Sequence, residues 1–485
     1  MPRTPFNPDA LPSILQGGMG VAVSSWELAR AVASAGEIGV ISGTAIDSVV
    51  VRELQDGDPY NRRAVLADYP DQEIAEHLID RYYNPEGRAE NQPYKLLPIH
   101  RFNPSVKSQR VLAAATYTEI RLAQQGHTGL IGINLMAKLK RYTLPCLYGA
   151  MLADVDIACI GAGIPMEEAR AIRALAKGEA TSLRLDVDTS QCDEPADTYT
   201  YDFDPADVLS PPPQMEPPAF FPIVSSDTLA RILHLKLPEE FVQGWVIEEP
   251  LAGGHNAPPR SKEYDEDGTP IYGERDKPNY DRVKKLGKPF YLAGGYGSPE
   301  GLAIAESVGA TGIQVGSLFS LADESGYPKH EKHALIRGLH TGEVRIRTDG
   351  MVSPTGFPFK VLTAPQTLGI PEQYQQRERI CDLGYLRTAY VDKKGRIFGR
   401  CPAEPVDDYV RKGGDVEDTE GRACLCNALL ANVGHAQQRD DEVELRLYTG
   451  GDTLLNLPLG SADDPQYTAD DVLAYLKKIT EPVPA

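Results

Sequence analysis

Short apolar runs alternate with helical patterns along the chain from residue 11 to about 345. Eight of the runs predict strands, at 11–16, 38–42, 130–135, 155–161, 220–226, 245–250, 289–294 and 312–317. Helical patterns at about 166–177, 226–235 and 299–309 fall between strands, and the capping-box spacing of Ser24 and Glu27 predicts a helix that starts there. Alternating strands and helices are typical of a parallel sheet, so eight units predict an α/β fold of the (β/α)8 TIM barrel type. A doubly wound open sheet is the alternative.

Three segments are too long or too polar for a minimal barrel. They lie at about 45–115, 180–219 and 256–288, and we interpret them as insertions. The periodicity ends near residue 346. Residues 346–485 hold scattered apolar clusters but no βα units, so this region needs a partner surface to bury them. We expect residues 1–345 to form the barrel, and residues 346–485 to form a C-terminal extension that packs on it and covers its ligand-binding face.

The formal net charge is −20, from 69 acidic and 49 basic residues. This balance disfavours binding to nucleic acid or to anionic membranes, because both need basic patches. No apolar segment approaches the roughly 20 residues of a spanning helix, and the N-terminus lacks the apolar run of a secretory signal. Seven cysteines in a chain of 485 residues do not make a disulfide framework. We therefore expect a cytoplasmic protein.

Several predicted strands end on glycine. These ends read Gln16-Gly17-Gly18-Met19, Ala252-Gly253-Gly254-His255, Ala293-Gly294-Gly295 and Gln314-Val315-Gly316-Ser317. Glycine lets the backbone turn sharply and approach a ligand closely. Ser298 and Pro299 then read as the start of a helix, whose amides would accept a phosphate dianion together with those of 315–317. The pattern predicts a phosphate-bearing cofactor at one face of the barrel, and tight turns that only close the barrel are the alternative.

These strand ends, together with Gly132-Ile133-Asn134-Leu135, resemble the nitronate monooxygenase (2-nitropropane dioxygenase-like) family of flavoproteins over residues 11 to about 345. The resemblance implies a TIM barrel that binds FMN, an architecture shared by flavin-dependent enoyl-thioester reductases. It implies that the backbone of 16–19 and the Met19 side chain lie against the isoalloxazine ring, and that Asn134 meets the pyrimidine edge. The implied cofactor-binding residues are Gln16, Gly17, Gly18, Met19, Asn134, Gly253, Gly254, Ala293, Gly294, Gly295, Gln314, Val315, Gly316 and Ser317.

The sequence departs from this family just before His255. The family has a Gln-Gly pair and then Glu-Ala-Gly-Gly-His, whereas this chain reads Glu248-Glu249-Pro250-Leu251 before Ala252. Together with the C-terminal region, this difference indicates a longer subgroup whose substrate need not be a nitronate.

His255 is the candidate catalytic residue, because an imidazole after two glycines is presented at the mouth of the fold. It would accept a proton from a carbon next to a nitro group or a thioester carbonyl, or donate a hydrogen bond to the substrate oxygen. A capping or supporting role is the alternative. Glu248 and Glu249 must face opposite sides of their strand. We expect the inward one to meet the flavin ribityl hydroxyls or to raise the pKa of His255.

Four cysteines lie close together in the C-terminal sequence. Cys381, Cys401, Cys424 and Cys426, with His435, contain enough soft ligands for zinc, but they lack the C-x2-C pair typical of such sites. We interpret them as buried free thiols that pack the cover and predict no metal site.

The leading functional hypothesis is an FMN-dependent oxidoreductase that oxidises a nitronate or a similar small anionic substrate with oxygen. The alternative is an enoyl-thioester reductase that uses NAD(P)H on a carrier-bound acyl substrate, as a homo-oligomer or as a subunit of a synthase complex. A non-redox lyase or isomerase acting on sugar phosphates is a second alternative, and a non-catalytic barrel subunit of a synthase is a third. The colour of the purified protein separates the flavoproteins from the lyase or isomerase.

Overall fold

The computed structural model describes residues 6–266, 268–440 and 442–478. The eight predicted strands form one parallel sheet, in the order β1-β11-β10-β9-β8-β4-β3-β2. At the two ends of this order, Leu15 and Ile38 form a parallel bridge that closes the sheet. The predicted (β/α)8 barrel is therefore confirmed, and the open sheet is excluded. Its strands are β1 (Ile14–Gln16), β2 (Gly39–Ser42), β3 (Ile131–Met136), β4 (Ile157–Gly161), β8 (Ala219–Val224), β9 (Trp245–Glu248), β10 (Phe290–Ala293) and β11 (Gly312–Val315).

The barrel strands alternate between two apolar environments, as the twofold period of a strand requires. One buried cluster fills the interior, and it includes Leu15, Val40, Ile157, Cys159, Phe221, Val246 and Tyr291. The residues between them pack outward against the helices, and they include Ile41, Ile133, Ile247, Leu292 and Ile313. Both sides of each strand are buried, which explains why the strands read as continuous apolar runs in the sequence.

A helix follows each strand. These helices are α1 (Trp26–Ser34), α5 (Val106–Ala123), α6 (Lys140–Leu152), α7 (Met166–Ala176), α8 (Asp227–Lys236), α9 (Tyr280–Lys284), α10 (Pro299–Ser307) and α12 (Lys329–Thr341), with the short α11 (Ser317–Ser320) directly after β11. The predicted cap of α1 was wrong by one residue, since the side chain of Ser25 accepts from the Leu28 N–H at 3.1 Å. Ser24 instead holds the turn after β1: its hydroxyl donates to the Gly17 carbonyl at 2.9 Å and accepts from the Met19 N–H at 2.9 Å.

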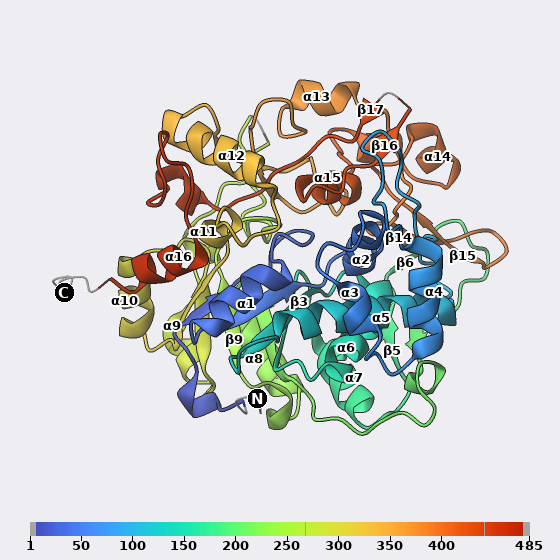
Figure 1. Cartoon of the computed structure of the whole chain (residues 1–485), viewed down its shortest axis with the longest axis horizontal. Helices are drawn as coiled ribbons and strands as arrows, with labels where there is room; N and C mark the ends of the chain where they lie inside the picture. The colour runs from blue at the N-terminus through green and yellow to red at the C-terminus, as the bar shows by residue number, and fades with distance from the viewer. Residues whose placement is uncertain (1–5, 267, 441, 479–485) are drawn as a thin grey trace.

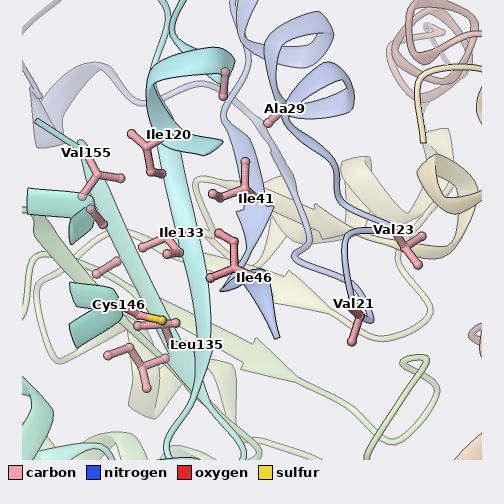
Figure 2. Close-up of a cluster of buried hydrophobic side chains, with 14 of the residues drawn as sticks. Val21, Val23, Ala29, Ile41, Ile46, Ile120, Ile133, Leu135, Cys146 and Val155 are labelled. Carbon is pink, nitrogen blue, oxygen red and sulfur yellow. The ribbon is translucent and has the colours of Figure 1, made fainter. Parts of the chain in front are cut away.

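The segments expected to be insertions add structure outside the barrel. The first forms α2 (Ile46–Gln55), α3 (Arg62–Leu66) and α4 (Gln72–Tyr82). The second forms an antiparallel pair, β5 (Thr181–Arg184) and β7 (Thr200–Phe203), and a short strand, β6 (Val187–Asp188), that pairs in parallel with β14 (Thr388–Val391) of the C-terminal region. The third is mostly loop and leads into α9. Figure 2 shows how the first insertion joins the outer core: Ile46 of α2 lies with Ile41 of β2 and Ile133 of β3.

The region after residue 345 forms short helices and antiparallel strand pairs instead of βα units. Its strands are β12 (Ile346–Asp349), β13 (Phe359–Leu362), β14 (Thr388–Val391), β15 (Ile397–Arg400), β16 (Gln438–Arg439) and β17 (Glu442–Val443). Its helices are α13 (Pro371–Gln376), α14 (Val406–Arg411), α15 (Leu425–Asn432) and α16 (Ala469–Leu476). Figure 1 shows α13 to α15 across the upper part of the molecule, whereas α16 lies beside α1 and α10. None of the helices in the described residues has the length and apolar character needed to cross a bilayer.

A buried polar network joins the first insertion, the barrel and the C-terminal region. The Asp47 carboxylate accepts from the Tyr385 hydroxyl at 2.5 Å and bonds to Nε2 of His100 at 2.8 Å. The Arg141 guanidinium on α6 donates to the carbonyls of Gly384 at 2.8 Å and Tyr385 at 3.2 Å. Burial by itself raises the pKa of Asp47, but the bonds from His100 and Tyr385 outweigh it and hold that pKa below its ordinary value.

Replacing Asp47 with Asn should lower the free energy of unfolding at pH 7 by about 3 kcal/mol, since it replaces the buried carboxylate that bonds to His100 and Tyr385. Because the folded pKa of Asp47 is depressed, its contribution is present above its unfolded pKa of about 3.9 and is lost as pH falls through the lower folded value. Urea denaturation of both proteins at pH 7 and in acid measures this, and the difference should shrink in acid. The exposed Asp408, paired with Arg411, is the control: Asp408→Asn should change stability by less than about 0.5 kcal/mol. An equal loss of unfolding free energy in the two variants would contradict a stabilising role of the network.

Candidate functional site

A cavity of about 480 Å³ opens at the carboxyl ends of the barrel strands. Its floor is the last inward-facing layer of the barrel, with one residue from or just after each strand: Gly17, Ser42, Asn134, Gly161, Ile223, Glu248, Ala293 and Gln314. Since active sites of such barrels lie at this face, the cavity is the candidate functional site. The fixed strand register, in which Ser42 pairs with Asn134 and Ala293 with Gln314, sets the position of each floor side chain.

The glycine turns predicted from the sequence shape the wall of this cavity. Gly18 has no room for a side chain, because an added Cβ would lie 2.2 Å from the Cβ of Asn134. Gly294 has a positive φ of 83°, and its Cβ would lie 2.3 Å from the Glu249 carbonyl oxygen. Beyond these turns, Ser298 caps α10 and Pro299 is its first residue, as predicted. The strand ends therefore present backbone to the same space, and the cap of α10 directly follows the lining residue Gly297.

The C-terminal region forms the opposite wall. Its lining residues are Phe357, Phe359, Tyr385, Leu386, Leu425, Cys426, Leu429, Thr449, Gly450 and Thr453. Backbone hydrogen bonds tie this wall to the loop after β9: the Lys360 N–H donates to the Gly254 carbonyl, and the Asn256 N–H donates to the Pro358 carbonyl, both at 2.9 Å. The Gly254 N–H also donates to the Thr449 hydroxyl at 2.9 Å. The cavity therefore lies between the barrel mouth and the C-terminal region.

His255 lies where the loop after β9 meets the C-terminal region. Its Nε2 shares a 2.7 Å hydrogen bond with the Ser353 hydroxyl, and its ring packs edge-on against Phe359 with centroids 4.7 Å apart. Burial, and to a lesser extent the charge of Lys138, lower the pKa of His255 to about 3. The imidazole is therefore neutral near pH 7. This overturns the expectation that a neighbouring glutamate raises the pKa of His255.

The two adjacent glutamates face opposite sides of β9, as predicted. Glu248 lines the cavity, and burial alone raises its pKa to about 7. Glu249 faces away and accepts hydrogen bonds from the hydroxyls of Tyr280 and Tyr296. A carboxyl that is half protonated near neutral pH and opens into a cavity can give or take a proton.

Lys138 is a cation that the sequence did not single out. It follows β3 and lies over the ring of Phe357, which lines the cavity. Its Nζ is buried and has no hydrogen-bond partner among the described residues, and burial lowers its pKa to about 7. A buried ammonium without a counter-charge loses its proton or takes up an anion.

The cavity collects most of the residues expected to bind the cofactor. The lining includes Gly17, Gly18, Met19, Asn134, Gly253, Gly254, His255, Ala293, Gly294, Gly295, Gln314, Val315, Gly316 and Ser317. Gln16 is outside this lining: its amide is buried, donates to Ser24 at 2.8 Å and accepts from the Val40 N–H at 2.8 Å. Strand alternation could have found this, since Leu15 faces the interior and its neighbour Gln16 must face out. The C-terminal wall had no periodic signal in the sequence.

We predict that His255 stays neutral from pH 8 down to about pH 4. Nitrogen chemical shifts of labelled histidine, assigned with the His255→Gln variant, measure this directly. The folded pKa of His255 lies below its ordinary value of about 6.5. Below pH 6.5 the unfolded chain therefore takes up a proton at His255 that the folded protein does not, and this lowers the free energy of unfolding. His255→Gln should therefore lose less stability than the parent protein between pH 6.5 and 4. A His255 that titrates near pH 6.5 would contradict this environment.

Comparison of the sequence with known protein families and with curated proteins gives no match. Comparison of the fold with solved structures gives matches at low identity. They include FabK from Thermotoga maritima (15% identity, 97% of this chain and 93% of that chain, TM-score 0.47). They also include nitroalkane oxidase from Streptomyces ansochromogenes (15% identity, 96% of this chain and 95% of that chain, TM-score 0.44). A third is the enoyl reductase domain of MlnA from the macrolactin biosynthesis cluster of Bacillus amyloliquefaciens (13% identity, 96% of this chain and 92% of that chain, TM-score 0.46). The likeness of this chain to these proteins is one of overall fold.

Proposed function

We propose that this protein is an FMN-dependent oxidoreductase that reduces the double bond of an enoyl thioester with NAD(P)H. The observation that carries the proposal is Glu248, a carboxyl with a pKa raised to about 7 by burial alone, on the floor of a cavity that His255 also lines. Such a group is a proton donor at neutral pH. A neutral imidazole is a weak base but a good hydrogen-bond donor, which fits stabilisation of a carbonyl oxygen better than removal of a carbon-bound proton.

The cavity has features that fit a flavin with one phosphate. The amide nitrogen of Gln314 is buried in the cavity floor and has no partner among the described residues, so it is available to a ligand carbonyl. The turn at 294–297, before Ser298 and the start of α10, and the turn at 316–317 contribute backbone to the cavity wall and would hold the phosphate. The Met19 thioether, next to Gly316, suits packing on a flat ring. FMN, when bound, supplies hydride transfer between a nicotinamide and the substrate.

The side chains of this chain supply the proton and the polarisation. The acid form of Glu248 would give its proton to the carbon next to the thioester carbonyl, and His255 would donate a hydrogen bond to the carbonyl oxygen. Ser353 fixes the imidazole through Nε2, so Nδ1 would be the ring nitrogen that donates to the ligand. The apolar side chains of the wall, among them Leu139, Leu229, Leu386, Leu425 and Leu429, would pack on the acyl chain and exclude water.

Oxidation of a nitronate with oxygen is the second candidate, and Lys138 is the observation that favours it. The Nζ of this lysine is the buried cation beside His255, and a nitronate would supply the anion that it lacks. In that case turnover would need oxygen and no NAD(P)H. It would also depend on Lys138, so Lys138→Met would lose most activity on a nitronate.

We predict that the purified protein carries FMN without a covalent link and that Gly295→Asp abolishes its retention. Gly295 has a φ of 93°, and an added Cβ would lie 2.9 Å from the Leu251 side chain, so the new residue strains the turn and places a negative charge near the phosphate. Flavin content after gel filtration, measured by absorbance, checks this. Gly273→Asp is the control, since a Cβ there meets nothing within 4 Å. Parent protein without flavin bands after reconstitution, or equal retention in both variants, would contradict the proposal.

We also predict that Glu248→Gln keeps the flavin but lowers kcat on an enoyl thioester by about 10²–10⁴-fold, the usual share of a general acid. Because the acid form is active, kcat/KM of the parent should fall as pH rises above about 7, and this limb should vanish in the variant. Glu249→Gln is the matched control at the next residue, just after β9, where the side chain accepts from Tyr280 and Tyr296 and does not line the cavity. Unchanged turnover in Glu248→Gln, or an equal loss in both variants, would remove Glu248 from the reaction.

A further inference from the structure

Four of the seven cysteines gather beside the cavity. Cys381 precedes the wall segment with Tyr385 and Leu386, and Cys401 directly follows β15, which pairs with β14. Cys424 caps α15, and Cys426 in its first turn lines the cavity. All are free thiols in this structure. These residues come from three separate segments, so the fold, rather than the sequence spacing, brings them together.

Cys381 and Cys401 form a close pair. Arg400 pairs with Thr388 in the β14–β15 ladder, which places Cys401 beside Arg387, and the Arg387 Nε–H donates to the Cys381 sulfur at 3.3 Å. A hydrogen bond from Cys401 and the charge of Arg387 outweigh burial and lower the pKa of Cys381 to about 6. Cys381 is half-buried and Cys401 is fully buried. One partner is thus a half-buried thiolate, and the other is a buried thiol beside it.

Cys424 and Cys426 differ from this pair. They also share a hydrogen bond, but they lie two residues apart at one helix start, and Asn427 donates to the Cys424 sulfur at 3.6 Å. A disulfide between them would have to distort the first turn of α15. Among the residues that the structure describes, no group of three or more Cys, His, Asp or Glu side chains is arranged to hold a metal ion. His435 is turned toward Glu53, 3.2 Å away, rather than toward the cysteines.

We propose that Cys381 and Cys401 are a redox-active dithiol, which a low-molecular-weight disulfide such as oxidised glutathione converts into an intrachain disulfide. The Cys381 thiolate would attack one sulfur of the small disulfide and release one thiolate. Cys401 would then lose its proton, attack the Cys381 sulfur and release the second thiol. Two electrons pass from the cysteine pair to the small disulfide, which leaves as two thiols.

Oxidation would change the position of residues in the cavity wall. Arg387 also donates to the Cys381 carbonyl at 2.9 Å, and its own carbonyl accepts from Arg141 at 3.2 Å. Arg387 therefore braces the segment 381–387, and with it the wall residues Tyr385 and Leu386. In the disulfide, the Cys381 sulfur carries no charge and is a poor acceptor, so Arg387 loses this contact. The site is a covalent modification point whose state is coupled to the shape of the cavity.

The test uses the full chain, incubated with oxidised glutathione, then acid-quenched and alkylated. We expect two fewer titratable thiols than the seven of the sequence, one peptide pair joined through Cys381 and Cys401 by mass spectrometry, and reversal by dithiothreitol. Cys381→Ser and Cys401→Ser should each block the loss of the second thiol, whereas Cys192→Ser, in the second insertion, should not. Hydrogen exchange at 382–388 should rise on oxidation.

Four results would overturn the proposal: no loss of thiols, a stable mixed disulfide at Cys381 in the parent, a disulfide between other cysteines, or one zinc ion bound per chain. The thiol count needs no flavin or substrate. Its outcome is therefore independent of the proposed function, and a protein that lacks flavin could still show the disulfide.

Discussion

The pairing between the loop after β9 and the strand β13 is the interaction on which the site depends. A barrel mouth is open by construction, because its loops radiate outward from the strand ends. In this chain, backbone hydrogen bonds of Gly254 and Asn256 with residues 358–360 close one side of the mouth. The same pairing fixes His255 against Phe359 and Ser353. Without it there would be neither an enclosed cavity nor a desolvated imidazole.

Desolvation then sets the chemistry. The enclosed space removes water from three ionisable groups that have no opposite charge in direct contact. Burial moves the pKa of Glu248 and of Lys138 to about 7 and that of His255 to about 3, so each shifts toward its neutral form. Two of these groups can therefore exchange a proton near neutral pH, while the third stays a neutral hydrogen-bonding group. One physical cause, exclusion of water, is the largest for all three.

The sequence predicted the barrel well because its signals are local. Apolar runs and glycine at strand ends are fixed by each strand and its turn, so the eight strands and the strand end at Gln314 could be found without a structure, and the family resemblance added Asn134. A cover formed by residues 346–485 was expected, but its wall residues could not be named, since Phe357, Tyr385 and Cys426 meet only through long-range contacts. Lys138 could not be identified from the sequence, because the lack of a partner for its Nζ depends on which residues surround it in the fold. Gln16 was expected to bind the cofactor but faces outward, one residue out of register with the inward positions. Ser24 was expected to cap α1, but the cap is Ser25, and helix ends are assigned from sequence only to within a residue or two.

The most direct test of a flavin site closed by the C-terminal wall is an anaerobic half-reaction experiment on the reconstituted full chain. Stopped-flow absorbance would follow bleaching of bound FMN by NADPH or NADH, and then its return on mixing with a medium-chain enoyl thioester. The expected result is rapid bleaching, then reoxidation by the enoyl thioester with formation of one equivalent of saturated thioester per flavin. A flavin that neither nicotinamide reduces, but that a nitronate reduces and oxygen reoxidises, would contradict the reductase assignment and leave nitronate oxidation in its place.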